Sequence, residues 1–162
     1  MKDVEIQEQV KKKLFLLNSF LHTASLPSGG ESDSALKHSV TVHFLQSVVM
    51  ELIIKVFFEL DCKKAAPFTH NLPKIYKNLS ADTKSMLEEK FNEARKRREQ
   101  QFAMISSDVV FHSLSDVLIN NEKTVKNFKY DAMAVQFNSS ADNAFYKEVI
   151  DYIKMKESRL IA

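Results

Sequence analysis

The sequence predicts an all-α fold: an up-and-down bundle of about five helices with one long central helix, in a single domain over residues 1–162. Only two glycines and three prolines are present, so few tight turns are available and an all-β fold is disfavoured. The hydrophobic fraction of 44% is ordinary, and a domain of this length buries about 70% of the surface exposed when unfolded. Apolar residues at helical spacing between Ser39 and Leu60 locate the central helix.

The central helix is predicted to begin at a cap provided by Ser32, Asp33 or Ser34 and to end near Leu60, a length of about 40 Å. Most of its circumference is apolar, which is typical of a helix inside a bundle. Its apolar positions include Leu45, Val48, Val49, Leu52, Ile53, Val56, Phe57 and Leu60. The remaining polar residues predict one narrow solvent-facing stripe, formed by His43, Ser47, Glu51, Lys55 and Glu59.

Two charged residues in this stripe, Glu51 and Lys55, indicate how the helix packs and whether it crosses a membrane. Glu51 and Lys55 are correctly oriented for an ion pair between positions i and i+4, and we expect a structural pair. A bilayer requires about 20 consecutive, mostly apolar residues, and here both charges fall near the middle of the run, where each is costly. We therefore expect a bundle helix and no membrane contact.

The segments that flank the central helix follow from local signals. A first helix is predicted over Asp3–His22, and Thr23–Ser34 is predicted as a loop because it contains proline, two glycines and several serines. Asp61–Thr69 is predicted as a turn segment. A short helix then runs from Pro73 to Leu79, with Thr69 or Asn71 as its cap.

The second half of the chain is predicted to contain three more helices. Ser80 opens a helix that ends near Ala103, and Ser106–Asp108 supplies a break before a helix over Val109–Asn121. Glu122–Asn138 has a weak pattern that indicates a short helical turn combined with a loop. The last helix is expected after the candidate caps Asn138, Ser139 and Ser140, with Phe145, Val149, Tyr152 and Ile153 facing inward.

Charge and cysteine content restrict the class of protein only loosely. Lys and Arg total 23 against 21 Asp and Glu, and a net charge of +2 does not identify a nucleic-acid or membrane partner. Cys62 is the only cysteine and cannot form an internal disulfide, which favours a reducing compartment. The first residues lack the apolar run of a signal peptide, so we expect a cytoplasmic location. No ligand pattern suggests a metal or a cofactor.

His70 is the most interesting single histidine because it lies between the central helix and the short helix. In that position it either pins the segment by donating a ring N–H to a carbonyl or carboxylate, or acts as acid, base or anion ligand. His38 and His43 are five positions apart and do not share a helix face, so they do not form a metal pair. The HExxH, phosphate-loop and GxSxG motifs are absent.

The densest basic cluster of the chain is Lys90 with Arg95, Lys96, Arg97 and Arg98. The guanidinium groups of Arg95 and Arg98 are candidates for contact with RNA phosphate. Glutamates are interleaved with these residues, and Glu93 with Arg97 predicts an i to i+4 pair. A solvated helix face is therefore the alternative interpretation.

Three stretches carry a resemblance to a known family: ELIIKVFFEL, PFTHNLPKIYKNL with the long charged helix that follows it, and NNEKTVKNFKYDA. Across Ala35–Ala132 the chain resembles the HEPN-like superfamily of helical domains found in bacterial defence and toxin–antitoxin systems. The third stretch departs from the family in having Lys129-Tyr130 where Arg-Tyr is expected. The resemblance implies a helical bundle, commonly a homodimer whose paired long helices form a cleft.

Active ribonucleases of this superfamily resemble one another in an arginine followed, after four to six residues, by a histidine. This chain lacks that motif, because the only histidine after any arginine is His112, at least thirteen intervening residues away. Lys64 has five residues between it and His70, which allows a degenerate Lys-His version. Lysine lacks the bidentate fork of arginine.

Three functional hypotheses follow. The first is a non-catalytic HEPN-like binding module that dimerises and engages RNA or a partner protein. The second is a metal-independent ribonuclease in which His70 acts as general acid or base and Lys64 stabilises phosphate charge. The third is a purely structural partner whose apolar surface binds another helix.

Overall fold

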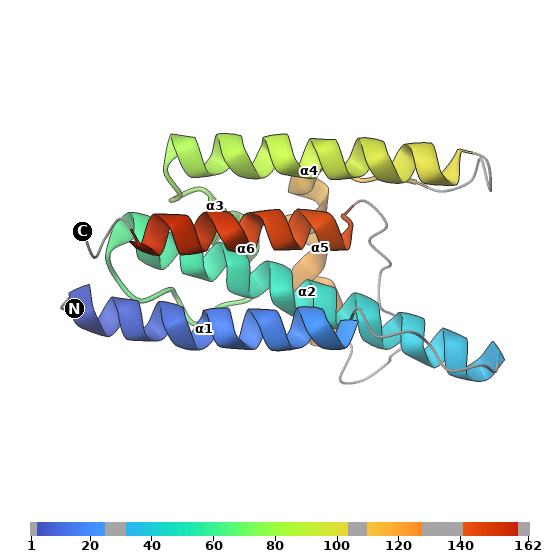
Figure 1. Cartoon of the computed structure of the whole chain (residues 1–162), viewed down its shortest axis with the longest axis horizontal. Coiled ribbons are helices and arrows are strands. Elements are labelled where there is room, and N and C mark those ends of the chain that lie inside the picture. Colours follow the sequence, from blue (N-terminus) through green and yellow to red (C-terminus); the bar gives the residue numbers. More distant parts are fainter. Residues whose placement is uncertain (1–2, 25–31, 104–109, 128–140, 159–162) are drawn as a thin grey trace.

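The computed structural model describes residues 3–24, 32–103, 110–127 and 141–158, and these residues form an all-α bundle as predicted (Figure 1). Six helices and no strand are present in this described part, in agreement with the expected bundle of about five helices. The helices are α1 (Asp3–Ala24), α2 (Ser32–Cys62), α3 (Leu72–Tyr76), α4 (Ala81–Phe102), α5 (Leu114–Asn127) and α6 (Asn143–Ser158).

The predicted long central helix is α2, which packs against α1, α3, α5 and α6. In Figure 1, α1 and α2 run antiparallel along one side, α4 lies on the opposite side, and α6 lies between them. The C-terminal half of α2 supplies much of the core through Val49, Met50, Ile53, Ile54, Val56, Phe57, Phe58 and Leu60. Its stretch Thr41–Cys62 is long and apolar enough to cross a membrane, by length and composition only, a property that core helices of soluble proteins share.

The polar stripe of α2 was predicted to face solvent, and for its two glutamates this prediction is wrong. Glu51 is 9% exposed and Glu59 only 2%. Lys13 of α1 donates to both oxygens of Glu59 at 2.6 and 2.8 Å, and the backbone N–H of Ala66 donates at 3.1 Å. Because a buried carboxylate is tolerated only when donors satisfy it, Glu59 forms an internal contact between α2, α1 and the segment after α2.

Several predicted helix starts are confirmed by their capping hydrogen bonds. Asn71 caps α3 by accepting from the N–H of Lys74 at 3.1 Å. Ser80 caps α4 by accepting from the N–H of Thr83 at 3.2 Å. The caps proposed for the last helix, Asn138–Ser140, lie outside the described residues. Asp142 provides the cap of α6, because its Oδ1 accepts from the N–H of Phe145 at 2.8 Å.

The boundaries predicted for α5 are wrong at both ends. The helix begins at Leu114 rather than residue 109, and Val110 is outside it with 69% exposure. A reciprocal capping box sets the start: the Oγ of Ser113 accepts from the N–H of Asp116, and Asp116 accepts from the N–H of Ser113, each at 3.2 Å. The helix continues past the predicted end at residue 121, and the buried Thr124 belongs to it.

Candidate functional site

His70 lies in the segment between α2 and α3, and its ring is held by α2. Its Nδ1 is 2.9 and 3.1 Å from the two carboxylate oxygens of Glu51. Glu51 also accepts from the Nζ of Lys55 at 2.7 Å, so the predicted Glu51–Lys55 pair forms. The side chain of His70 remains 45% exposed. Glu51 therefore joins a half-exposed histidine to the middle of the core helix.

Lys64, the proposed partner of His70 in phosphate chemistry, is engaged elsewhere. Its Nζ lies 5.5 Å from the ring centroid of Phe58, a cation–π contact. Within the residues that the structure describes, no interaction joins Lys64 to His70. The degenerate Lys-His pattern therefore does not correspond to an assembled pair of side chains.

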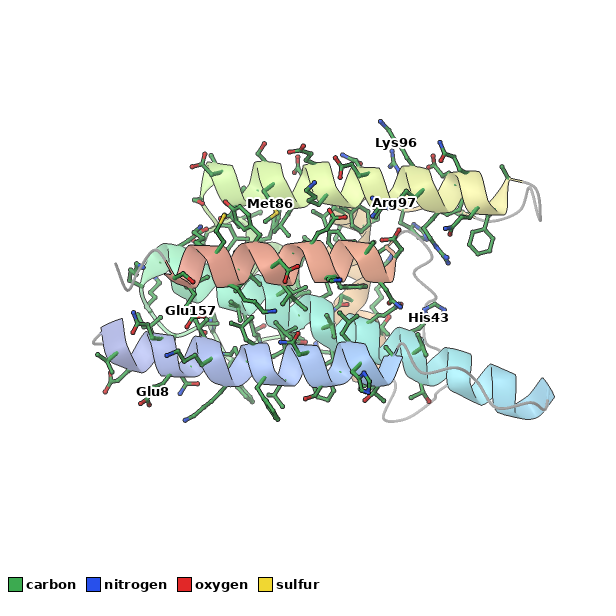
Figure 2. The ribbon with its side chains drawn as sticks, viewed as in Figure 1. Glu8, His43, Met86, Lys96, Arg97 and Glu157 are labelled. Atoms are coloured by element: carbon green, nitrogen blue, oxygen red, sulfur yellow. The ribbon has the colours of Figure 1, made fainter. Side chains whose placement is uncertain are left out.

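The basic side chains of α4 divide between the surface and the bundle. Figure 2 shows Lys96 pointing away from the molecule, whereas Arg97 lies on the side of α4 that faces α6. Arg97 binds both oxygens of Asp142, through Nε at 2.8 Å and Nη2 at 3.0 Å. The predicted Glu93–Arg97 pair is replaced, because Glu93 contacts Lys90 at 3.1 Å. The fork of Arg97 thus ties α4 to the start of α6.

The two arginines proposed to contact RNA remain near the surface. Arg95 is within 3.4 Å of Glu99 on the next turn of α4. Arg98 stacks over the ring of Phe102 at 4.6 Å and donates to Gln101 at 3.3 Å. Neither of them forms a bidentate carboxylate pair like that of Arg97 among the described contacts.

A cleft around His43 brings together residues that the sequence analysis did not connect. Two pockets share His43 and Gln46 in their linings, and we call them together the His43 cleft: the smaller pocket is its inner lobe and the larger pocket its outer lobe. The inner lobe is a cavity of about 30 Å³ lined also by Ser47, Met50, His112, Val117, Asn120, Asn121, Thr124 and Tyr146. The outer lobe is about 130 Å³ and is lined also by Arg98, Ala141, Asp142 and Asn143.

The electrostatics of the His43 cleft favour an uncharged imidazole at neutral pH. Burial lowers the pKa of His43, the positive charge of Arg98 lowers it further, and a hydrogen bond to Gln46 opposes both effects. The Nδ1–H of His43 donates to the Oε1 of Gln46 at 3.3 Å, which leaves Nε2 as the acceptor nitrogen. Burial also raises the pKa of Tyr146, so its hydroxyl stays protonated.

Asp142 contributes the one carboxylate among the described lining residues, and its charge is already compensated. Although burial raises the pKa of Asp142, the hydrogen bonds from Arg97 and from the N–H of Phe145 outweigh burial and hold it below its usual value. Because Arg97 neutralises Asp142, the guanidinium of Arg98 gives the described lining of the outer lobe a net positive charge, which favours an anion there.

One sequence signal pointed to this cleft. Leu114, Val117 and Leu118 form the apolar face of α5, and Asn121 and Thr124 continue that face at helical spacing. Amides and hydroxyls at core positions indicate a buried polar site. This polar continuation of the apolar face was overlooked because the helix was predicted to end at residue 121, before Thr124. The contributions of His43, Arg98 and His112 depend on how α2, α4 and α5 pack, which no local pattern reveals.

The remaining polar cluster near the core joins the ends of three helices. Asp61, at the end of α2, accepts from the N–H of Ser80 at 2.8 Å, from the hydroxyl of Thr83 at 3.3 Å and from the Nζ of Lys156. Lys156 also donates to Thr83 at 2.8 Å. All these groups are satisfied by one another, which is typical of a structural network.

Metal binding finds no support in the described ranges, where no group of three or more His, Cys, Asp or Glu side chains could hold an ion. No family model, curated protein or solved structure matches the chain. The fold and the His43 cleft define this protein as an all-α bundle with a partly buried polar cleft.

Proposed function

We propose that the chain is a non-catalytic, HEPN-like helical binding module that engages RNA. The observation that carries the non-catalytic part is the separate engagement of the two candidate catalytic residues: His70 is bound to Glu51, and Lys64 stacks on Phe58. A ribonuclease site requires an acid or base and a phosphate-stabilising cation at one reacting centre. No described contact supports that arrangement at His70.

RNA is the favoured partner because of the cationic face near the end of α4. Arg95 and Arg98 lie one turn apart there, and planar guanidinium forks suit phosphate oxygens. The net charge of +2 gives little long-range attraction, so binding depends on this local face. We expect an affinity that falls steeply as salt is raised, because phosphate contacts release counterions.

Retention of a mixed labelled RNA pool tests this proposal. We expect Arg95→Glu/Arg98→Glu to weaken retention by about tenfold or more, since two phosphate contacts become repulsive. Lys11→Glu/Lys12→Glu is the matched control, because it changes the net charge equally on exposed positions of α1. Equal losses in the two double variants would show that only overall charge matters, and this face would then not be an RNA site.

A metal-independent ribonuclease centred on His70 is the second candidate, and one observation favours it. A carboxylate hydrogen-bonded to one imidazole nitrogen, as Glu51 is to Nδ1 of His70, orients and stabilises a histidine that acts as a general base. Cleavage of the RNA pool by the wild type but not by His70→Ala would overturn the non-catalytic proposal. Intact RNA with both proteins supports it.

The proposal includes a homodimer, which the family resemblance implies. Exposed apolar side chains on α1 are compatible with a protein contact, with Phe15 at 73%, Val4 at 64% and Leu16 at 42% exposure. Light scattering at micromolar concentration should give the mass of two chains. A mass of one chain, close to 18.6 kDa, would contradict the dimer.

A further inference from the structure

We propose that the His43 cleft is a binding site for a phosphate group, with the inner lobe taking phosphate oxygens and Arg98 binding at the outer lobe. The cleft is distinct from the Glu51–His70 pair and does not depend on it. Figure 2 shows His43 on the side of α2 that faces α4 and α6, and Arg98 of α4 and Asn143 of α6 line the outer lobe with it. The chemistry of its lining supports an anion.

The inner lobe contains a buried donor that lacks a partner. Asn121 is only 4% exposed, and its Nδ2 has no hydrogen-bond partner among the described residues. A buried N–H group without an acceptor is destabilising, so such a group in a native structure requires an explanation. Asn121 lines the inner lobe, where an oxygen of a bound ligand would supply the acceptor.

The other groups of the inner lobe match the same ligand. Among the described residues that line it, none is a carboxylate or a lysine, whereas His112, Asn120 and Thr124 are able to donate hydrogen bonds. The absence of a carboxylate from this lining removes the repulsion that would exclude an anion. Neutral donors in a low-dielectric cavity bind anionic oxygens more strongly than the same groups do in water.

Size and charge assign the two lobes different parts of the ligand. The inner cavity of about 30 Å³ holds about two atoms of water size, which is enough for phosphate oxygens but not for a base or a sugar. The outer lobe of about 130 Å³ accommodates the rest of the group beside Arg98. Asp142 lies there as well, but Arg97 holds both of its oxygens.

Two sources could supply this phosphate: a free small molecule, or the terminal phosphate of an RNA chain. The second source rests on the proposed RNA function, whereas the site itself does not. Inorganic phosphate is therefore the first probe. Its binding is followed through the ring resonances of the histidines by NMR, and we expect saturable shifts of His43 and His112 that exceed those of His22 and His70.

Two substitutions on α4 distinguish specific phosphate binding in the cleft from weak electrostatic attraction at the surface. Arg98→Gln should weaken phosphate binding by about tenfold, the loss of one charge-assisted contact. Lys96→Gln is the matched control, since it removes one positive charge from the same helix but points away from the molecule, and it should change the affinity less than about twofold (Figure 2). Equal losses in Arg98→Gln and Lys96→Gln would overturn the proposal.

Asn121→Leu provides an independent test inside the cavity. It should weaken phosphate binding while raising the thermal midpoint of the ligand-free protein, because an unpartnered buried amide is replaced by an apolar group of similar size. Thr124→Val tests the same lobe with a smaller change and should also weaken binding. Unchanged phosphate affinity in both variants, or no saturable shift in the wild type, would overturn the site.

The source of the phosphate is decided by short oligonucleotides. If a 5′-phosphorylated trinucleotide binds more tightly than inorganic phosphate while its 5′-hydroxyl form fails to shift His43, the site receives an RNA end. If inorganic phosphate binds as tightly as the phosphorylated trinucleotide, the ligand is a free phosphate compound. Loss of RNA retention in the single variant Arg95→Glu tests the proposed function separately, because Arg95 is not among the described residues that line the cleft, whereas Arg98 belongs to both proposals.

Discussion

Glu59 illustrates how a single charged residue is accommodated inside this bundle. It is 2% exposed, and both of its described donors lie outside α2: the Nζ of Lys13, which contacts both carboxylate oxygens, and the N–H of Ala66. The attraction between Glu59 and Lys13 offsets the cost of removing both charges from water. The pair therefore specifies how α1 and α2 align more than it adds net stability.

Removing Lys13 should be strongly destabilising because it leaves the charge of Glu59 buried with one backbone donor. We predict that Lys13→Met lowers the free energy of unfolding by about 3 kcal/mol, measured by urea denaturation. Lys12→Met, at an exposed position, should stay within about 0.5 kcal/mol of the wild type. Similar losses in the two variants would contradict this role of Lys13.

Replacing both Lys13 and Glu59 tests whether the loss in Lys13→Met comes from the buried, unpaired charge of Glu59. The double variant Lys13→Met/Glu59→Met should be more stable than Lys13→Met alone, because apolar groups of similar size fill the contact without a buried charge. If the double variant is less stable than Lys13→Met, then Glu59 still stabilises the fold without Lys13, through its hydrogen bond from the N–H of Ala66.

At the scale of the element, α5 shows that one capping box outweighs a run of apolar residues. Valines at 109 and 110 favoured an early helix start, yet the helix begins after Ser113, whose side chain and backbone both bond with Asp116. Two orphan N–H groups are satisfied by this reciprocal arrangement. The apolar residues before it do not satisfy those groups.

The capping box gives a matched pair of serine substitutions. Ser113→Ala should lower the free energy of unfolding by about 1 kcal/mol because the N–H of Asp116 loses its acceptor. Ser115→Ala lies in the first turn of α5 at an exposed position and should be neutral or slightly stabilising, since alanine has the higher helix propensity. The two stabilities are compared by thermal and urea unfolding. A neutral Ser113→Ala would mean that solvent replaces the cap.

The helices also show which features of this fold could be predicted from the sequence and which could not. Ser80 was predicted as a cap and Asn71 was one of two candidate caps, with Thr69, because capping signals are local; the long apolar helix was predicted because its period is local as well. Burial of the polar stripe on α2 was missed, since it depends on Lys13 and Ala66 arriving from separate segments. The His43 cleft was missed for the same reason, because four separate parts of the chain contribute to it.

At the scale of the whole molecule, the network of Asp61 links α2, α4 and α6 and should make stability depend on pH. Burial raises the pKa of Asp61, but hydrogen bonds from Lys156, Ser80 and Thr83 outweigh burial and lower it below its ordinary value. A carboxyl whose pKa is lower in the folded state stabilises the protein above its unfolded pKa. That contribution is lost as pH falls through the folded pKa.

We therefore predict that the free energy of unfolding falls as pH is lowered from about 5 toward 2, and that Asp61→Asn makes this fall shallower. Asp151→Asn is a suitable control because Asp151 is 59% exposed and pairs only with Lys154 among the described contacts. Urea midpoints measured across this range give the two slopes. The same slope in Asp61→Asn and the wild type would show that other carboxyls dominate acid unfolding.

The order in which α1 and α2 occur in the chain has a consequence for synthesis. Thr41–Cys62 is apolar enough to be mistaken for a membrane span while it is still unfolded, which exposes a nascent chain to aggregation and to mistargeting. Its most extensive partner, α1, precedes it and has already left the ribosome when this stretch emerges. The α1–α2 hairpin can thus shield the stretch during translation, before α4 and α6 have been made.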